Sequence, residues 1–236
     1  MYKVITYIIF CLIVFPVKAQ DLVGAWESVI TSETGEQLKT VLIVSESHNA
    51  FTTYNNKTGA FVSTRGGSWK LDGQTLIEKV EFNTDNPETV GLEKRTQVFI
   101  NDSVLNIEGN VLKMNRIDNG TPGKLQGAWL MSGRTKDGVT QVRDITLPRK
   151  TMKILSGTRF QWIAYNTETK QFMATGGGTY TTKNGEYTET IEFFSKDIEK
   201  VGLQLNFNFN LKDGNWHHTG FSTKGDPIDE VWSKRN

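Results

Sequence analysis

Two neighbouring histidines, His217 and His218, and the glutamate Glu189 are the side chains of this sequence best suited to acid–base or metal chemistry. Consecutive side chains of a strand point to opposite faces, so His217 and His218 cannot bind one metal ion together. The third histidine, His48, lies far upstream, and we therefore predict no metal site. His218 and Glu189 can share acid–base work only within reach of a common substrate, and nothing in the sequence fixes their separation.

Other catalytic motifs are missing from the sequence. It contains no Gly-x-Ser-x-Gly motif and no recognisable Ser-His-acid set. We therefore predict no catalytic residue and no cofactor. An enzyme that uses His218 and Glu189 is the alternative.

The elements that position these residues belong to an internal sequence repeat with two copies. An ungapped match at an offset of 111 positions covers residues 40–117 and places Glu78 on Glu189. The second copy carries an insertion near residues 134–149. A unit of this length is a small domain, because solenoid repeats span only ~20–50 residues. The predicted domains are a first barrel at residues 20–118, a linker at 119–124 and a second barrel at 125–236.

Each copy is predicted to be all-β, with eight short antiparallel strands and no helix longer than a turn or two. In the second copy the strands are expected at residues 125–134, 151–155, 158–166, 171–182, 186–195, 202–212, 215–223 and 228–234. Eight sequential strands favour an up-and-down barrel, because closure removes exposed edges. The glycine pair Gly66-Gly67 and its counterpart Gly177-Gly178 are interpreted as sharp bends in the closed sheet.

The strand period of two assigns the inner faces. From residue 203 to 211, Leu and Phe at odd positions alternate with Gln and Asn, so the apolar set is expected to face inward. Trp216 and His218 align with the apolar Leu105 and Ile107 of the first copy. They are therefore expected to point inward, while His217 points to solvent.

An acid breaks the apolar inner face in both copies. Glu189 shares a register with Tyr187, Ile191 and Phe193, as Glu78 does with Leu76, Val80 and Phe82. A buried carboxylate is costly unless it is paired or protonated. One interpretation is a structural carboxylate bonded to an arginine, a tyrosine hydroxyl or a backbone amide. The other is an acid that faces a ligand.

The inner positions of the second copy are more aromatic than those of the first. Eight strands leave little room beyond their own side chains, so the second barrel is either a packed core or a cup for one flat apolar ligand. For a cup, the predicted ligand-binding residues are Phe160, Trp162, Tyr180, Glu189, Phe207, Trp216 and His218. The expected ligand is a small hydrophobic or aromatic molecule.

The Gly-x-Trp motif on the first strand of each copy, at Gly24–Trp26 and Gly127–Trp129, resembles the signature of lipocalins and the wider calycin superfamily. A basic residue near the last strand, Arg116 or one of Lys234 and Arg235, lies where such barrels pack a cation over that tryptophan. The second copy also resembles lipocalin-like domains of uncharacterised secreted proteins from Bacteroidetes.

The resemblance implies two tandem lipocalin-like barrels in an exported binding protein. Because some calycin barrels catalyse isomerisation, cyclisation or decarboxylation, it also implies the alternative of a lyase or isomerase that uses His218 and Glu189. A structural envelope module with two filled barrels is a third interpretation.

The first residues are predicted to be a secretory signal peptide. A basic start precedes the apolar residues 4–17, and Val17 and Ala19 suit cleavage after Ala19, which predicts a periplasmic or secreted protein. The only cysteine, Cys11, lies in this segment, so the mature chain is expected to have no disulfide. We also expect no transmembrane segment in the mature chain. The 27 Lys and Arg nearly balance the 26 Asp and Glu and form no basic stripe, so no nucleic-acid partner is expected.

Overall fold

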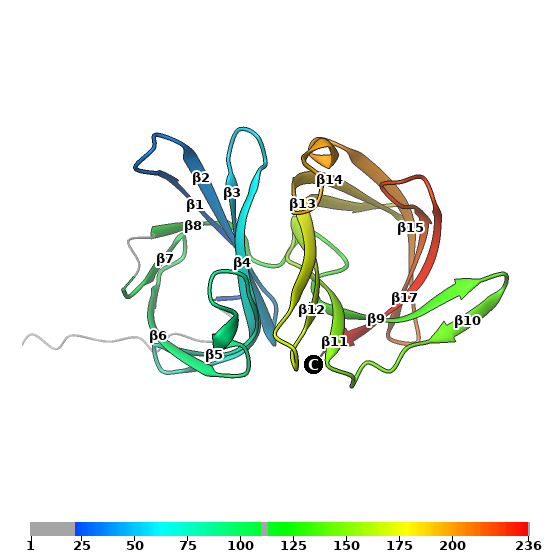
Figure 1. The fold of residues 1–236 in the computed structure, drawn as a ribbon, viewed down its shortest axis with the longest axis horizontal. Helices are drawn as coiled ribbons and strands as arrows, with labels where there is room; N and C mark the ends of the chain where they lie inside the picture. Colours follow the sequence, from blue (N-terminus) through cyan, green and yellow to red (C-terminus); the bar gives the residue numbers. More distant parts are fainter. Residues whose placement is uncertain (1–21, 110–112, 236) are drawn as a thin grey trace, which may run out of the picture.

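Residues 22–109 and 113–235, which the computed structural model describes, form two closed β-barrels that lie side by side (Figure 1). Their helical elements are two 3-10 turns, η1 (Pro87–Thr89) and η2 (Ile198–Lys200). The predicted all-β fold with two tandem eight-stranded antiparallel barrels is confirmed. The predicted signal peptide at residues 1–19 lies outside the described residues.

The first barrel is an up-and-down meander in which each strand pairs with the next and β8 pairs with β1 to close the sheet. Its strands are β1 (Gly24–Thr31), β2 (Gln37–Val44), β3 (His48–Asn55), β4 (Phe61–Asp72), β5 (Thr75–Asn83), β6 (Glu93–Ile100), β7 (Val104–Ile107) and β8 (Lys113–Asp118).

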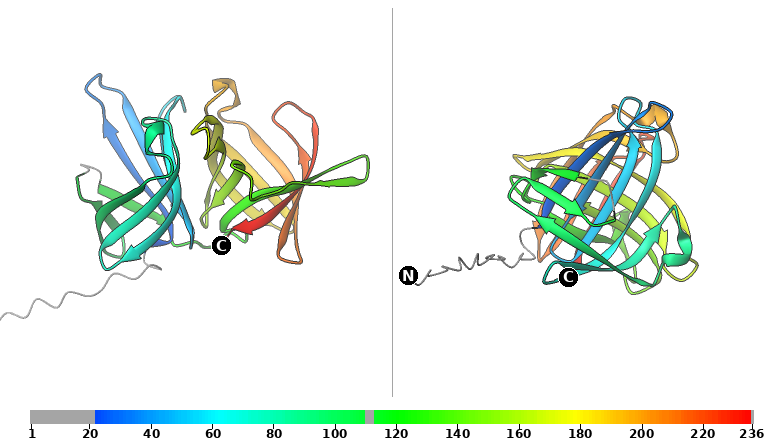
Figure 2. Two further views of the ribbon diagram at one scale, coloured as in Figure 1. Left: turned by 60° about the horizontal axis from the view of Figure 1, so that its bottom comes forward. Right: turned by 90° about the vertical axis from the view of Figure 1, so that its left-hand side faces the viewer.

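The second barrel repeats this topology and adds one strand. It consists of β9 (Gly127–Lys136), β11 (Arg149–Leu155), β12 (Arg159–Asn166), β13 (Phe172–Lys183), β14 (Glu186–Phe194), β15 (Gln204–Lys212), β16 (Asn215–Phe221) and β17 (Pro227–Arg235), closed by pairing of β17 with β9. The predicted insertion forms β10 (Val139–Val142), which pairs with the end of β9 and gives a hairpin that projects from the barrel (Figure 2). This strand was not expected from the sequence.

The paired glycines mark bulges at equivalent places in the two barrels. The register shifts between Gly66 and Gly67 where β4 pairs with β5, and between Gly177 and Gly178 where β13 pairs with β14. A side chain on Gly67 or Gly178 would collide with a carbonyl oxygen of the neighbouring strand. The glycines are therefore architectural, as the sequence predicts.

The bulges overturn one prediction about the inner faces. An extra residue reverses the faces beyond it, so Phe82 and Phe193 do not share the inner register. Instead, Phe193 stacks on Tyr54 of the first barrel with ring centroids 4.9 Å apart, and Phe82 contacts Tyr165 of the second at 5.0 Å.

The predicted register of β15 holds only at its centre. Phe207 is buried, and Leu205 and Phe209 are partly buried, whereas their Gln and Asn neighbours are exposed. Leu203, just before the strand, and Leu211, near its end, are 37% and 47% exposed. The barrel wall is therefore apolar on its inner face only where the strand crosses the core.

The two barrels meet through equivalent strands of the repeat, with β3 and β4 facing β12 and β13 (Figure 1). Phe61 stacks on its own repeat equivalent, Phe172, with ring planes 9° apart. The Tyr54 hydroxyl donates to Glu192 of the second barrel at 2.6 Å, and the equivalent Tyr165 hydroxyl donates to Glu81 of the first at 2.5 Å. The same contact is thus made twice, in opposite directions.

Hydrophobic packing across this interface explains why β2 has apolar side chains on both faces. Leu42 and Val44 pack inside the first barrel, while Val41 and Ile43 pack at the interface. The buried interface cluster consists of Val41, Ile43, Ala50, Tyr54, Phe82, Ala128, Leu130, Met152, Ile154, Ile163, Tyr165 and Phe193. Burial of apolar side chains on this scale favours one fixed arrangement of the two barrels.

The connection between the barrels is tied down by hydrogen bonds. The carboxylate of Asp118, at the end of β8, accepts from the backbone amides of Gly157 and Thr158 and from the hydroxyls of Ser156 and Thr158. The predicted linker at residues 119–124 therefore starts from an anchored residue.

The basic residues near the last strands have different partners. The Arg116 guanidinium lies 3.9 Å from the ring centroid of Trp26. In the second barrel, Lys234 pairs in register with Trp129, whereas Arg235 reaches across the interface and donates to Glu81 at 2.7 Å. The cation over the Gly-x-Trp tryptophan is thus present in the first barrel.

Candidate functional site

The residues predicted to bind a ligand come together inside the second barrel. Phe160, Tyr180, Glu189, Phe207, Trp216 and His218 are each at most 5% exposed. Trp162 is half-buried and contacts the same cluster from the edge. His218 and Trp216 point inward, as the register predicts, while His217 is half-exposed. Their role in ligand binding is still a prediction.

Aromatic rings fill the centre of this barrel around Tyr187. The ring centroid of Tyr187 lies 5.2–6.4 Å from those of Phe160, Tyr180, Phe207, Trp216 and His218. His218 packs closest to Phe207, at 4.3 Å. Tyr187 therefore packs against five other rings at the centre of the barrel.

A lysine that sequence analysis missed, Lys153 of β11, is buried among these rings. Its ammonium lies 2.7 Å from Glu189 Oε1, and the Tyr187 hydroxyl donates to the same oxygen at 2.7 Å. The ammonium is also 5.1–5.6 Å from the ring centroids of Tyr187, Phe207, Trp216 and Trp232. These contacts agree with the interpretation of Glu189 as a structural carboxylate, with a lysine as its cation.

The pattern around Lys153 explains why it was overlooked. Lys153 lies between Met152 and Ile154, and an alternating strand with those apolar neighbours normally points its charged residue to solvent. Here Met152 and Ile154 pack at the interface between the barrels, which turns Lys153 inward. The charge could be found only by recognising that β11 is covered on both faces.

His218 has a different acidic partner from the one predicted. Its Nδ1 lies 3.4 Å from Glu230 Oε2, and the Trp232 indole donates to the same oxygen at 3.2 Å. Burial, with a smaller effect of the nearby Lys153 charge, lowers the pKa of His218, so the imidazole is neutral at pH 7. Glu189 is held by Lys153, so the two members of the predicted acid–base pair belong to separate contacts.

Two buried polar atoms beside this contact have no hydrogen-bond partner among the described residues. They are Nε1 of Trp216 and Nε2 of His218, whose rings lie 5.1 Å apart. With the Nδ1 proton directed at Glu230, Nε2 is an acceptor, whereas the indole N–H is a donor. A buried polar atom left unpaired costs ~1–3 kcal/mol. A hydroxyl group, which both donates and accepts, would satisfy the pair.

Six partly buried apolar side chains, called the apolar rim below, pack against the rings. Its members are Met131, Trp162, Phe194, Leu205, Phe209 and Ile228. Trp162 meets Phe194 edge-on, with centroids 5.5 Å apart. A side chain on Gly176 would lie only 2.8 Å from the Trp162 indole nitrogen, so this glycine gives the Trp162 ring its place on the wall.

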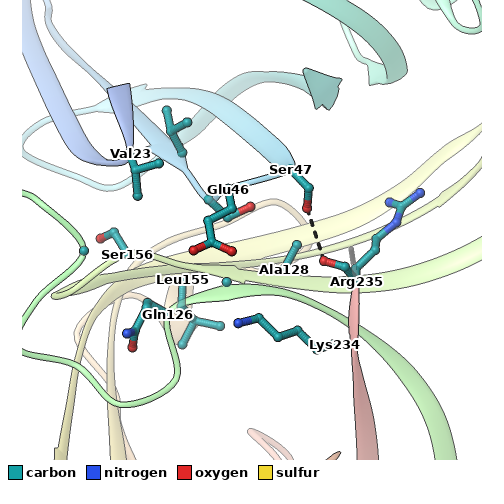
Figure 3. Close-up of a pocket in the computed structure, with 13 residues that line it drawn as sticks. Val23, Glu46, Ser47, Gln126, Ala128, Leu155, Ser156, Lys234 and Arg235 are labelled. Carbon is teal, nitrogen blue, oxygen red and sulfur yellow. Dashed lines mark hydrogen bonds between the residues drawn. The ribbon is translucent and has the colours of Figure 1, made fainter. Parts of the chain in front are cut away.

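A hollow lies outside the barrels, in the groove between them (Figure 3). This cavity of about 360 Å³ has apolar walls that include Val44 and Leu155, and Glu46 and Lys234 line it from opposite barrels. Ser47 of the first barrel donates to the carbonyl of Arg235 beside it at 3.1 Å. None of the predicted ligand-binding residues lines this groove.

One protein family matches part of the chain. Residues 124–236 match the model of a family described as a domain of unknown function (DUF4488). The match covers the whole second barrel, from β9 to β17. No curated protein matches the chain.

Two general findings concern the part of the chain that the structure describes. Within residues 22–109 and 113–235, no group of three or more His, Cys, Asp or Glu side chains is arranged to hold a metal ion. The same residues include no helix with the length and apolar character needed to cross a membrane.

Proposed function

We propose that the protein is an exported, lipocalin-like binding protein that holds a small hydrophobic or aromatic molecule in its second barrel and does not transform it. The observation that carries this proposal is the unpartnered pair formed by Trp216 Nε1 and His218 Nε2 beneath the apolar rim. Ligand sites in proteins typically combine an apolar lining with a few polar groups that fix orientation.

The polar pair also narrows the chemistry of the ligand. A flat molecule passes the rim formed by Trp162 and Phe194, and its hydroxyl accepts from the Trp216 indole and donates to His218 Nε2. The ion pair of Lys153 and Glu189 stays intact below it, because both charges already have partners. Binding therefore requires no separation of buried charges.

Matching contacts at the Gly-x-Trp motifs support the lipocalin-like part of the proposal. The Trp26 indole donates to the carbonyl of Leu22 at 2.9 Å, and the Trp129 indole donates to the carbonyl of Leu125 at the same distance. Leu22 and Leu125 are both buried. In each barrel, the segment before the first strand is thus held against one end of the core.

Native mass spectrometry of the protein purified from its own host tests this proposal. Tryptophan fluorescence followed during extraction with organic solvent reports on the same event. A co-purifying small molecule is expected in the wild type and in His217→Gln, where the half-exposed neighbour is changed. It should be lost from His218→Gln and Trp216→Phe. Bare protein with unresponsive fluorescence, or equal retention in all variants, would contradict the proposal.

A further inference from the structure

The interior of the first barrel is lined by different side chains from the interior of the second. At four matched positions of the repeat, the inner side chains of the first barrel are smaller. Asn49, Leu76, Thr96 and Leu105 stand where the second barrel has Phe160, Tyr187, Phe207 and Trp216. Because both barrels have eight strands, these four side chains fill less space at their positions than their counterparts do.

Two cations lie near Glu78 in the first barrel, the partly buried Arg65 and the exposed Lys94. Arg65 Nη1 lies 2.8 Å from Glu78 Oε2, and its guanidinium covers the Phe51 ring at 4.1 Å. Lys94 is directly opposite Glu78 in the β5–β6 register, and side chains opposite one another share a face. Two cations therefore face one carboxylate.

The two cations influence each other. The Arg65 charge, with a smaller effect of burial, lowers the pKa of Lys94. A bound anion between the two groups would relieve this repulsion.

Three buried polar atoms of the first barrel have no hydrogen-bond partner among the described residues. Both side-chain amide atoms of Asn49 and the Oε1 atom of Glu78 are in this state. Asn49 is 1% exposed and Glu78 is 3% exposed. Asn49 lies on the same face of β3 as Phe51, so its amide points into the barrel. A buried amide with neither atom paired is unusual, because nearly all buried polar groups in proteins have a hydrogen-bond partner.

A hollow of about 400 Å³ lies on the side of the first barrel, along β6 and the residues that follow β7. Lys94, Thr96, Gln97 and Glu108 line it. A small molecule can therefore approach Lys94 from the side of the barrel.

We propose that the first barrel contains a second, independent binding site for a small hydroxycarboxylate. The carboxylate pairs with Lys94 and Arg65, the Asn49 amide donates to it, and a hydroxyl of the ligand donates to Glu78 Oε1. A monoanion suits the charge balance, because Glu78 would repel a second negative charge. This chemistry differs from that of the apolar ligand proposed for the second barrel.

Isothermal titration of the whole mature protein with lactate, glycerate and mandelate tests the site. At least one probe is expected to bind with one molecule per chain. Lys94→Leu and Thr96→Phe each install the second-barrel residue, and each should weaken binding about tenfold or more. Lys57→Met, in the exposed β3–β4 turn, is the matched control and should bind as the wild type does. His218→Gln should also leave probe binding unchanged, which separates this site from the proposed function.

Three results would overturn the proposal. One is the absence of binding by every probe at about 10 mM, which would assign the unpaired atoms to buried water. The second is undiminished binding in Lys94→Leu and Thr96→Phe. The third is loss of probe binding in His218→Gln. Melting curves identify a variant that fails to fold, and the other substitution then decides.

Discussion

The two barrels hide the same acid but neutralise it with cations from different strands. Glu78 is paired by Arg65 from β4, whereas Glu189 is paired by Lys153 from β11. The residue equivalent to Arg65 is Gly176, whose missing side chain makes room for the Trp162 ring. Moving the cation to another strand thus allowed the second barrel to become more aromatic without abandoning its buried carboxylate.

The comparison also separates the residues that maintain the barrel fold from the residues that we assign to ligand binding. The bulge glycines, the Gly-x-Trp strand and the buried acid occur in both copies, so they belong to the frame. His218 and Trp216 occur in the second copy alone, and Asn49 and Lys94 in the first alone. The residues we assign to ligands are those that differ.

The largest loss of folding stability is expected when the cation of a buried ion pair is removed. Lys153→Met leaves Glu189 uncompensated in the aromatic core and should destabilise the protein by ~3–5 kcal/mol. Arg65→Met should cost less, because the Arg65 side chain is 20% exposed and that of Lys153 only 7%. Urea unfolding followed by circular dichroism measures both. An equal or larger loss of stability in Arg65→Met would contradict the claim that the buried acid of the second barrel depends more strongly on its cation.

The next largest effect is a loss of folding stability at low pH caused by His48. Burial, helped by the Arg235 charge, lowers the pKa of His48 to about 4, so the imidazole is neutral in the folded protein. Below its unfolded pKa of about 6.5, the unfolded chain binds the extra proton, and stability falls as the pH decreases toward 4. His48 should account for a loss of about 2 kcal/mol between pH 7.5 and pH 5.

His48→Gln is the variant that isolates this effect, because the equivalent residue of the second barrel is Arg159, which does not titrate in this range. Denaturant unfolding at several pH values should show a smaller loss of stability in acid for the variant. A profile as steep as that of the wild type would assign the acid sensitivity to other groups, such as His218.

A smaller loss of stability is expected when either interface tyrosine loses its hydroxyl, and the two losses should differ. Tyr54→Phe removes the hydroxyl bond to Glu192, which keeps one Arg159 bond at 2.7 Å. Tyr165→Phe removes the bond to Glu81, which keeps two Arg235 bonds at 2.7 Å each. We expect a loss of ~1–3 kcal/mol for Tyr54→Phe and a smaller loss for Tyr165→Phe. The reverse order in thermal unfolding would show that the Arg235 contacts do not support Glu81.

The barrel fold could be predicted from the sequence because it depends on local sequence patterns. Alternation, turn residues and the internal repeat were enough for two barrels and for the inward direction of Trp216 and His218. The bulges reversed Phe82 and Phe193 because a single extra residue changes every face beyond it.

The interface and Lys153 could not be predicted in the same way. Tyr54, Glu81 and their equivalents align in the repeat, but alignment does not say that they bind each other across two domains. Lys153 enters the core because the other face of its strand is covered by the first barrel, which is distant in the sequence. Both misses come from long-range packing.

The most direct test of the binding proposal is the indole resonance of Trp216 in a nitrogen–proton NMR spectrum, assigned with Trp216→Phe and recorded before and after solvent extraction. We expect this resonance to shift when the ligand leaves, since its N–H then loses its acceptor. The Trp26 and Trp129 resonances should stay in place, because their indoles donate to the backbone carbonyls of Leu22 and Leu125. An unchanged Trp216 resonance would contradict a ligand in the second barrel.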